Sequence, residues 1–165
     1  MRRCAALVAI ALLGTISACA GSGDAGNAPS EDSLYAAVAT KALRDCGFEV
    51  LNTIYVREAL YDDVLAVDYE GDPEFLSEED KTSIRTALGS FAPVVFYADP
   101  SVVVDADWNL LPDRLVLLVG PLQEVHGNWG IDAGVRAGAD FYVGWYPVNP
   151  DTGEVGDSPP ITFSD

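Results

Sequence analysis

The sequence predicts an α+β domain in which two helices from the N-terminal half pack on a curved antiparallel sheet. Two observations lead to this fold class. Helical spacing of apolar residues is confined to residues 31–46 and 78–88. After Ser90, short apolar runs alternate with turn residues such as glycine and proline, which is typical of antiparallel strands.

The first predicted helix covers residues 31–46. Ser30 can accept hydrogen bonds from the free N–H groups of the first turn, and Glu31 and Asp32 suit the positive end of the helix dipole. Gly47 follows where a left-handed residue would end the helix. Apolar side chains recur at every fourth position of this segment, namely Leu34, Val38, Ala42 and Cys46.

The second predicted helix covers residues 78–88. Ser77 and Asp80 approximate a capping box, and two glutamates fill the first turn. Ile84 and Leu88 supply the apolar seam, and a glycine at the next position ends the helix.

The remaining elements are predicted as strands. Among residues 48–56, both the odd-numbered and the even-numbered positions carry apolar side chains. This pattern favours a strand that is covered on both faces. Residues 59–70 fit either period, and we expect a loop or a short helical turn there. Gly120-Pro121 is expected to halt the apolar run before it. The strands predicted after Ser90 are 94–97, 115–119, 129–135, 141–146 and 161–163. This order of elements is loosely similar to cystatin-like and NTF2-like folds, an analogy that no motif supports.

The N-terminal segment has the parts of an export signal. Met1-Arg2-Arg3 is positively charged, and residues 5–16 are uncharged and mostly apolar. As a helix this stretch would reach roughly 18 Å, well short of the ~30 Å hydrocarbon core of a bilayer. It closes with Ile16-Ser17-Ala18-Cys19, which resembles the lipobox of bacterial lipoprotein precursors.

This resemblance covers only the first 20 or so residues, yet it fixes an expected location. It implies cleavage before Cys19, a diacylglyceryl group on the Cys19 sulfur, and anchoring in the cell membrane on its extracytoplasmic side. At least two lipid chains would then hold the protein stably on the bilayer. The predicted organisation is a removed signal peptide (1–18), the lipidated cysteine with a flexible tether (19–30), and one folded domain (31–165). An ordinary secretory signal with an incidental Cys19 is the alternative.

Charge limits which molecules the protein is expected to bind, and cysteine content limits which disulfides it can form. Against 26 acidic residues the chain has nine basic ones, and its net charge is −17. Phosphate backbones and anionic headgroups repel such a surface, so we expect no nucleic-acid binding. Because Cys4 would leave with the signal and Cys19 would carry lipid, Cys46 has no partner for a disulfide within the chain.

No metal site or cofactor is predicted. His126 is the only histidine, and Cys46 would be the only free thiol, so no zinc constellation can be assembled. Cys46 lies at the negative end of its helix and on the apolar stripe, which favours a small buried side chain over a nucleophile. Residues 105–109 have the alternate acidic spacing of an EF-hand loop, but Leu110 and Val116 replace its glycine and its glutamate. An acidic connecting loop is the expected outcome.

The aromatic segment 141–146 is the most suggestive candidate for binding. On a strand its residues alternate, so Tyr142 and Tyr146 would flank Gly144 on one face. Together with Trp129 they could form a flat platform for a ligand or partner protein. If a helix covers that face, the tyrosines are core residues instead.

No catalytic residue is assigned by these patterns. The sequence predicts a lipid-anchored cell-envelope protein whose domain binds an envelope protein or a small ligand without catalysis. Two alternatives stay open: an envelope hydrolase that uses paired carboxylates, and a purely structural envelope protein.

Overall fold

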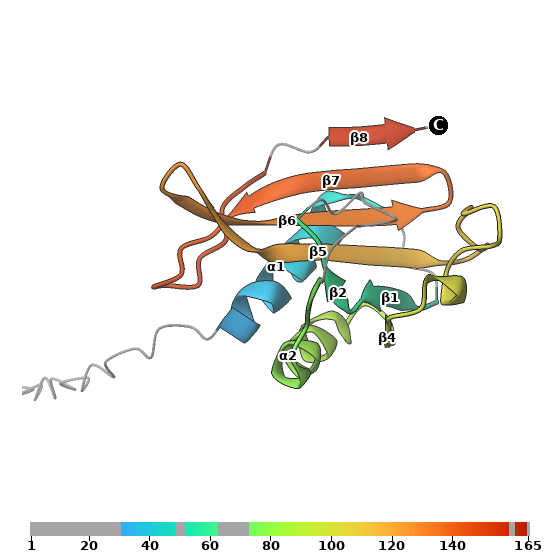
Figure 1. Cartoon of the computed structure of the whole chain (residues 1–165), viewed down its shortest axis with the longest axis horizontal. Coiled ribbons are helices and arrows are strands. Elements are labelled where there is room, and N and C mark those ends of the chain that lie inside the picture. The colour runs from blue at the N-terminus through green and yellow to red at the C-terminus, as the bar shows by residue number, and fades with distance from the viewer. Residues whose placement is uncertain (1–30, 49–51, 63–72, 159–160, 165) are drawn as a thin grey trace, which may run out of the picture.

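The computed structural model describes residues 31–48, 52–62, 73–158 and 161–164, and all structural statements concern these residues. Two helices, α1 (Glu31–Asp45) and α2 (Glu78–Leu88), lie against a six-stranded sheet (Figure 1). The strands are β1 (Ile54–Arg57), β2 (Ala59–Leu60), β3 (Glu74–Phe75), β4 (Val94–Tyr97), β5 (Leu115–Val125), β6 (Asn128–Ala137), β7 (Asp140–Pro147) and β8 (Ile161–Ser164). Their order in the main sheet is β4-β1-β5-β6-β7-β8, and β2 and β3 form a small separate sheet.

The predicted α+β class and both predicted helices are confirmed. Helix α1 ends at Asp45, one residue before the expected end, and Gly47 follows with the left-handed φ of 69°. Helix α2 begins after a complete capping box, in which Ser77 Oγ accepts from Asp80 N at 3.0 Å. The Asp80 carboxylate accepts from Ser77 N at 2.7 Å in return.

The sheet is mixed, so the expectation of an antiparallel sheet is only partly right. Strands β5 to β8 are antiparallel neighbours, but β1 runs parallel to both β4 and β5. The reason is the crossover between β1 and β4, which contains α2. A connection of that length returns the chain to the same end of the sheet, so that the next strand is parallel.

Three strand boundaries also differ from expectation. Strand β5 does not stop at Gly120-Pro121: its register with β6 shifts between Val119 and Leu122, which indicates a bulge, and pairing then continues to Val125. The strand expected from residue 48 is observed only from Ile54, with residues 49–51 outside the described parts. Ala59 and Leu60 form β2 rather than a loop or helical turn, and residues 63–70 are not described.

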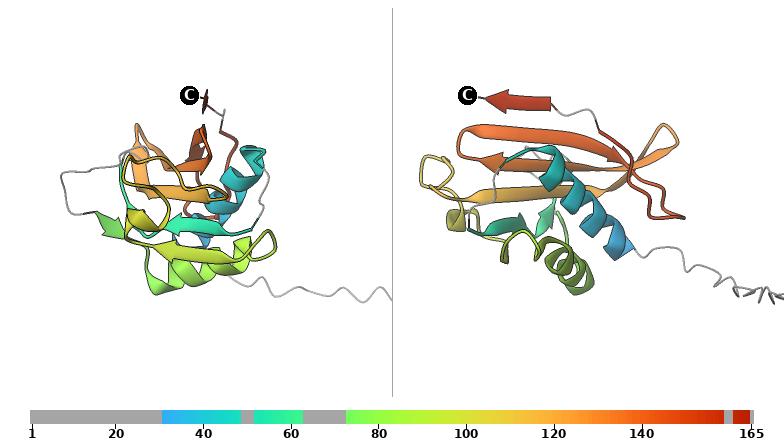
Figure 2. Two further views of the ribbon diagram at one scale, coloured as in Figure 1. Left: turned by 90° about the vertical axis from the view of Figure 1, so that its right-hand side faces the viewer. Right: turned by 180° about the vertical axis from the view of Figure 1, so that it is seen from behind.

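The main core lies between α1 and the sheet. Alternate residues of β1, β5, β6 and β7 point toward the helices, as Ile54, Leu117, Val135 and Ile131 do, and each of these four is fully buried. Helix α1 contacts β5, β6 and β7, whereas α2 packs on α1 and β4. Seen from behind, α1 crosses this face of the sheet (Figure 2). We call this the helix face.

The opposite side of the sheet, which we call the second face, is covered differently. At one end Tyr97, Val103 and Val116 form a small second core, where the segment after β4 folds over the strands. That segment includes a short 3₁₀ helix at Pro100–Val102. Neither α1 nor α2 packs on this face.

The cap of α2 gives a stability prediction. Ser77→Ala removes the acceptor for Asp80 N, so the free energy of unfolding should fall by about 1 kcal/mol in urea titrations with an unchanged m-value. Ser83→Ala, within the same helix, is the matched control and should be neutral or slightly stabilising. Equal effects from the two substitutions would contradict the role of the cap.

Candidate functional site

The lipidation site proposed at Cys19 lies outside the described residues. None of the helices among the described residues is both long and apolar enough to cross a membrane. The geometry of candidate sites therefore comes from the folded part of the chain.

Tyr142 and Tyr146 do not form the open platform proposed for them. Both flank Gly144 as expected, but they lie on the helix face and are 2% and 0% exposed. Their hydroxyl oxygens are 3.1 Å apart in a buried hydrogen bond. Burial raises the pKa of both phenols. For these two residues the alternative holds: α1 covers the side of β7 to which they point, so they are core residues and not a platform.

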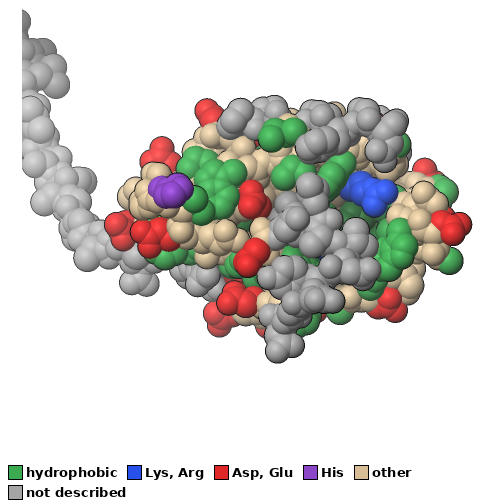
Figure 3. Space-filling view, turned by 45° about the horizontal axis from the view of Figure 1, so that its top comes forward, with side chains coloured by type: hydrophobic (Ala, Val, Ile, Leu, Met, Phe, Trp, Pro, Cys, Tyr) green, Lys and Arg blue, Asp and Glu red, His purple; other side chains and the backbone are tan. Residues whose placement is uncertain are grey.

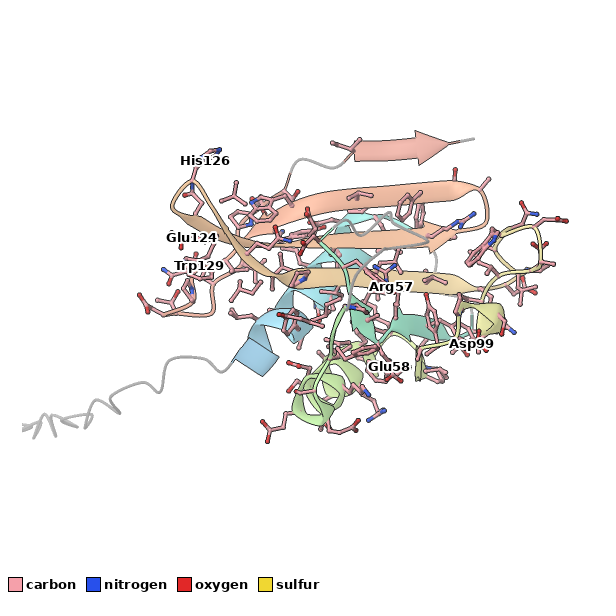
Figure 4. All side chains as sticks on the ribbon, viewed as in Figure 1. Arg57, Glu58, Asp99, Glu124, His126 and Trp129 are labelled. Atoms are coloured by element: carbon pink, nitrogen blue, oxygen red, sulfur yellow. The ribbon has the colours of Figure 1, made fainter. Side chains whose placement is uncertain are left out.

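Trp129 is exposed, whereas the two tyrosines are buried. It belongs to the end of the β5–β6 hairpin, whose turn residues His126 and Gly127 have φ values of 51° and 82°. Figure 4 shows Glu124, His126 and Trp129 gathered at this tip. In the space-filling view His126 marks one end of the molecule, beside a hydrophobic patch and among acidic side chains (Figure 3). The three proposed binding residues therefore do not share one surface.

The second face carries aromatic side chains that sequence reasoning assigned to no site. Phe141 and Trp145 point to the side of β7 opposite to that of the two tyrosines, and both are partly exposed. Their rings lie over glycines of β6. An added Cβ at Gly134 would be 3.1 Å from two ring carbons of Phe141, and one at Gly130 would overlap the Trp145 indole. The two glycines thus let two flat rings lie along β6.

Three of the nine basic residues also lie on the second face. Arg57 ends β1, Arg114 directly precedes β5, and Arg136 pairs with Val116 across β5 and β6. Figure 4 shows Arg57 close to the middle of the sheet. In a chain of net charge −17, this is a local concentration of positive charge.

Arginines and lysines have different partners in this protein. All ion pairs recorded between described residues use Lys41 or Lys81, for example Lys81 Nζ with Glu58 Oε2 at 2.9 Å. Four arginines instead lie over aromatic rings. The ring centroid is 4.4 Å from the guanidinium carbon for Arg57 over Tyr61, and 4.8 Å for Arg114 over Tyr55. The other two pairs are Arg44 over Phe91 and Arg85 over Phe96.

Tyr97, a member of the second core, lies near two of these arginines, Arg57 and Arg136. Its side chain is 6% exposed, and burial raises the pKa of its phenol to about 12. The positive charges of Arg57 and Arg136 act in the opposite direction and favour the phenolate. The phenol is therefore a neutral hydrogen-bond donor at physiological pH.

A side pocket of about 320 Å³ opens beside the bulge of β5. Gln123 Nε2 donates to Asp62 Oδ1 at 3.3 Å at its rim. Behind the bulge, Tyr35 Oη of α1 accepts from Leu122 N at 3.2 Å. The pocket is lined by Leu60, Tyr61, Asp62, Pro73, Glu74, Pro121, Leu122 and Gln123.

The other candidate groups have structural surroundings. Asp105 Oδ1 accepts from Asp107 N and Asn109 N at 2.9 Å each, so it organises its own loop and its pKa is lowered by these bonds. Cys46 is half-buried, and burial raises the pKa of its thiol. Among the described residues no three His, Cys, Asp or Glu side chains are grouped closely enough to hold a metal ion.

Comparison with known proteins adds no identification. The chain matches no family model, no curated protein and no solved structure.

The buried phenol of Tyr97 gives a prediction for alkaline pH. A tyrosine in the unfolded chain ionises near pH 10, whereas folded Tyr97 keeps its proton to about pH 12. Between these values the unfolded state loses the proton first, so stability present below pH 10 is lost at up to ~1.4 kcal/mol per pH unit. Tyr97→Phe should make the decline between pH 10 and pH 12 less steep in urea titrations. An unchanged slope would show that Tyr97 ionises equally in both states.

Proposed function

We propose that the protein is a lipoprotein of the cell envelope, anchored through lipid on Cys19 at the extracytoplasmic side of the cell membrane. The support is the N-terminal sequence, in which a positive segment, an apolar segment, small residues and a cysteine follow one another. The folded domain would then act at the end of a short tether. Its activity would be exerted on molecules that reach the outer side of that membrane.

We further propose that this domain binds an envelope ligand or partner protein without catalysis, through the second face. One observation carries this proposal: the two helices cover only one side of the sheet, and flat rings and arginines occupy the other. Partly exposed aromatic rings beside guanidinium groups offer both stacking and charged hydrogen bonds. Such surfaces are typical of recognition rather than of a spacer.

The envelope hydrolase is the second candidate, and the side pocket is its natural place because Asp62 and Glu74 both line it. A general acid in such a pair needs a raised pKa. Among the described carboxylates, Asp99, Asp105 and Asp157 have a lowered pKa, the direction opposite to that of a general acid. We favour binding because the second face offers rings and guanidinium groups suited to recognition.

The loose likeness to cystatin-like and NTF2-like folds stays a proposal. A helix lying across an antiparallel part of the sheet supports it. The parallel strands β4 and β1 depart from the antiparallel sheet that we expected by this analogy.

The anchor is tested by Cys19→Ser in the natural host. A hydroxyl cannot take the lipid, so the variant should move from the membrane pellet to the soluble or secreted fraction. Detergent partitioning and the mass of the wild-type N-terminal peptide report the lipid directly. Full sedimentation of the variant with membranes would contradict the proposal.

Binding through the second face is tested by affinity capture of the full chain from its own membranes. The wild type and the control variant Phe75→Ala/Trp108→Ala, which truncates two exposed rings elsewhere, should retain one specific component. The variant Phe141→Ala/Trp145→Ala should lose it, because its stacking rings are gone.

Folding of both variants is checked by urea unfolding. A second variant, Phe141→Leu/Trp145→Leu, keeps apolar bulk above the glycines but lacks the ring faces, and it should lose the component as well. Capture that survives in both second-face variants would overturn the proposed surface.

A further inference from the structure

Arg114 and Arg136 are neighbours on the second face. Leu115 pairs with Ala137 and Val116 with Arg136, so Arg114, one position before Leu115, is diagonally opposite Arg136. Diagonal neighbours on one face have Cβ atoms about 7–8 Å apart, which two long side chains easily bridge. The two guanidinium groups can therefore reach a common point above the start of β5.

This arrangement is electrostatically unfavourable as it stands. Like charges on neighbouring strands repel each other. None of the ion pairs recorded between described residues includes Arg114 or Arg136. Arg114 Nε is buried and has no hydrogen-bond partner among the described residues. A buried donor without an acceptor destabilises a fold, so the position favours the arrival of a negatively charged acceptor.

A ring contact positions the Arg114 side chain without neutralising its charge. The Tyr55 ring lies 4.8 Å from the Arg114 guanidinium carbon and supports it from one side. Val116, which pairs with Arg136, packs with Tyr97 in the second core. A guanidinium held in this way keeps its planar set of N–H donors free for a carboxylate or a phosphate.

We propose that Arg114 and Arg136 bind a phosphate or carboxylate group of the ligand of the second face, an inference that rests on the proposed binding function. Oxygen atoms of this group accept hydrogen bonds from both guanidinium groups. Tyr97 packs with Val116 in the second core next to this site.

The same face suggests the shape of the ligand. From Arg136, strand β6 continues to Gly134 under Phe141 and to Gly130 under Trp145, a length of about 20 Å. An elongated acidic molecule would place its acidic group at the arginines and lay a ring-bearing body along the two aromatic side chains.

The test uses the full chain in non-ionic detergent micelles and two separate probes, inorganic phosphate and malonate, at constant ionic strength. Binding is followed by NMR through the Nε–H signals of the arginines. The signals of Arg114 and Arg136 should shift and saturate with at least one probe. Saturation by phosphate alone assigns a phosphorylated ligand, and saturation by malonate alone assigns a carboxylated one.

Matched substitutions separate this site from general charge effects. Arg114→Gln and Arg136→Gln should each weaken binding by about 10- to 100-fold, because a charged hydrogen-bond donor is lost. Arg44→Gln and Arg85→Gln remove arginines that also lie over rings, and they should leave binding unchanged. Arg136→Lys keeps the charge without the planar donors and should give an intermediate affinity.

Two outcomes would overturn the inference. One is the absence of saturation with either probe, and the other is an equal loss of binding in the Arg44→Gln or Arg85→Gln variant. If capture from membranes still depends on Phe141 and Trp145 while neither probe saturates, only the anion site at Arg114 and Arg136 is contradicted. If the probes saturate while capture is independent of the rings, the proposed function falls instead.

Discussion

The packing of α1 across strands β5, β6 and β7 is the constraint on which the remaining structure depends. Because neighbouring residues of a strand point to opposite sides, one covered face fixes the direction of every side chain in these strands. Tyr142 and Tyr146 become core residues with joined hydroxyl groups, and Phe141 and Trp145 turn to the second face. A slip of one residue in β7 would reverse both assignments.

A second general feature is that the described lysines and arginines make different kinds of contact. The lysines take carboxylates, and four arginines lie over aromatic rings. A guanidinium is planar and weakly hydrated, so it stacks on a ring at little desolvation cost, whereas an ammonium favours a compact anion. In a chain with 26 acidic residues, the ring contacts of Arg57 and Arg114 place two of the few positive charges on the second face.

The bulge at Gly120-Pro121 links the fold to its two minor surface features. Pairing of β5 and β6 continues past the bulge, so the hairpin ends at His126 and Gly127 with Trp129 exposed near its tip (Figure 4). The N–H of Leu122, just past the bulge, is satisfied by the Tyr35 hydroxyl of α1. Pro121, Leu122 and Gln123 form one wall of the side pocket. A local irregularity of one strand thus shapes a pocket and an exposed tip together.

The sequence by itself determined the local elements: both helices, the capping box of α2, and the existence of most strands. These follow from interactions between residues a few positions apart, such as Ser77 with Asp80. Only the tertiary structure decided which face of β7 is buried, that β1 is parallel to β5, and that Arg114 lies beside Arg136. Segment 141–146 would present apolar side chains on both sides of a strand, so its pattern does not predict which side α1 covers. Strand order and register arise from contacts between residues far apart in the chain, and a single sequence carries no local signal for them.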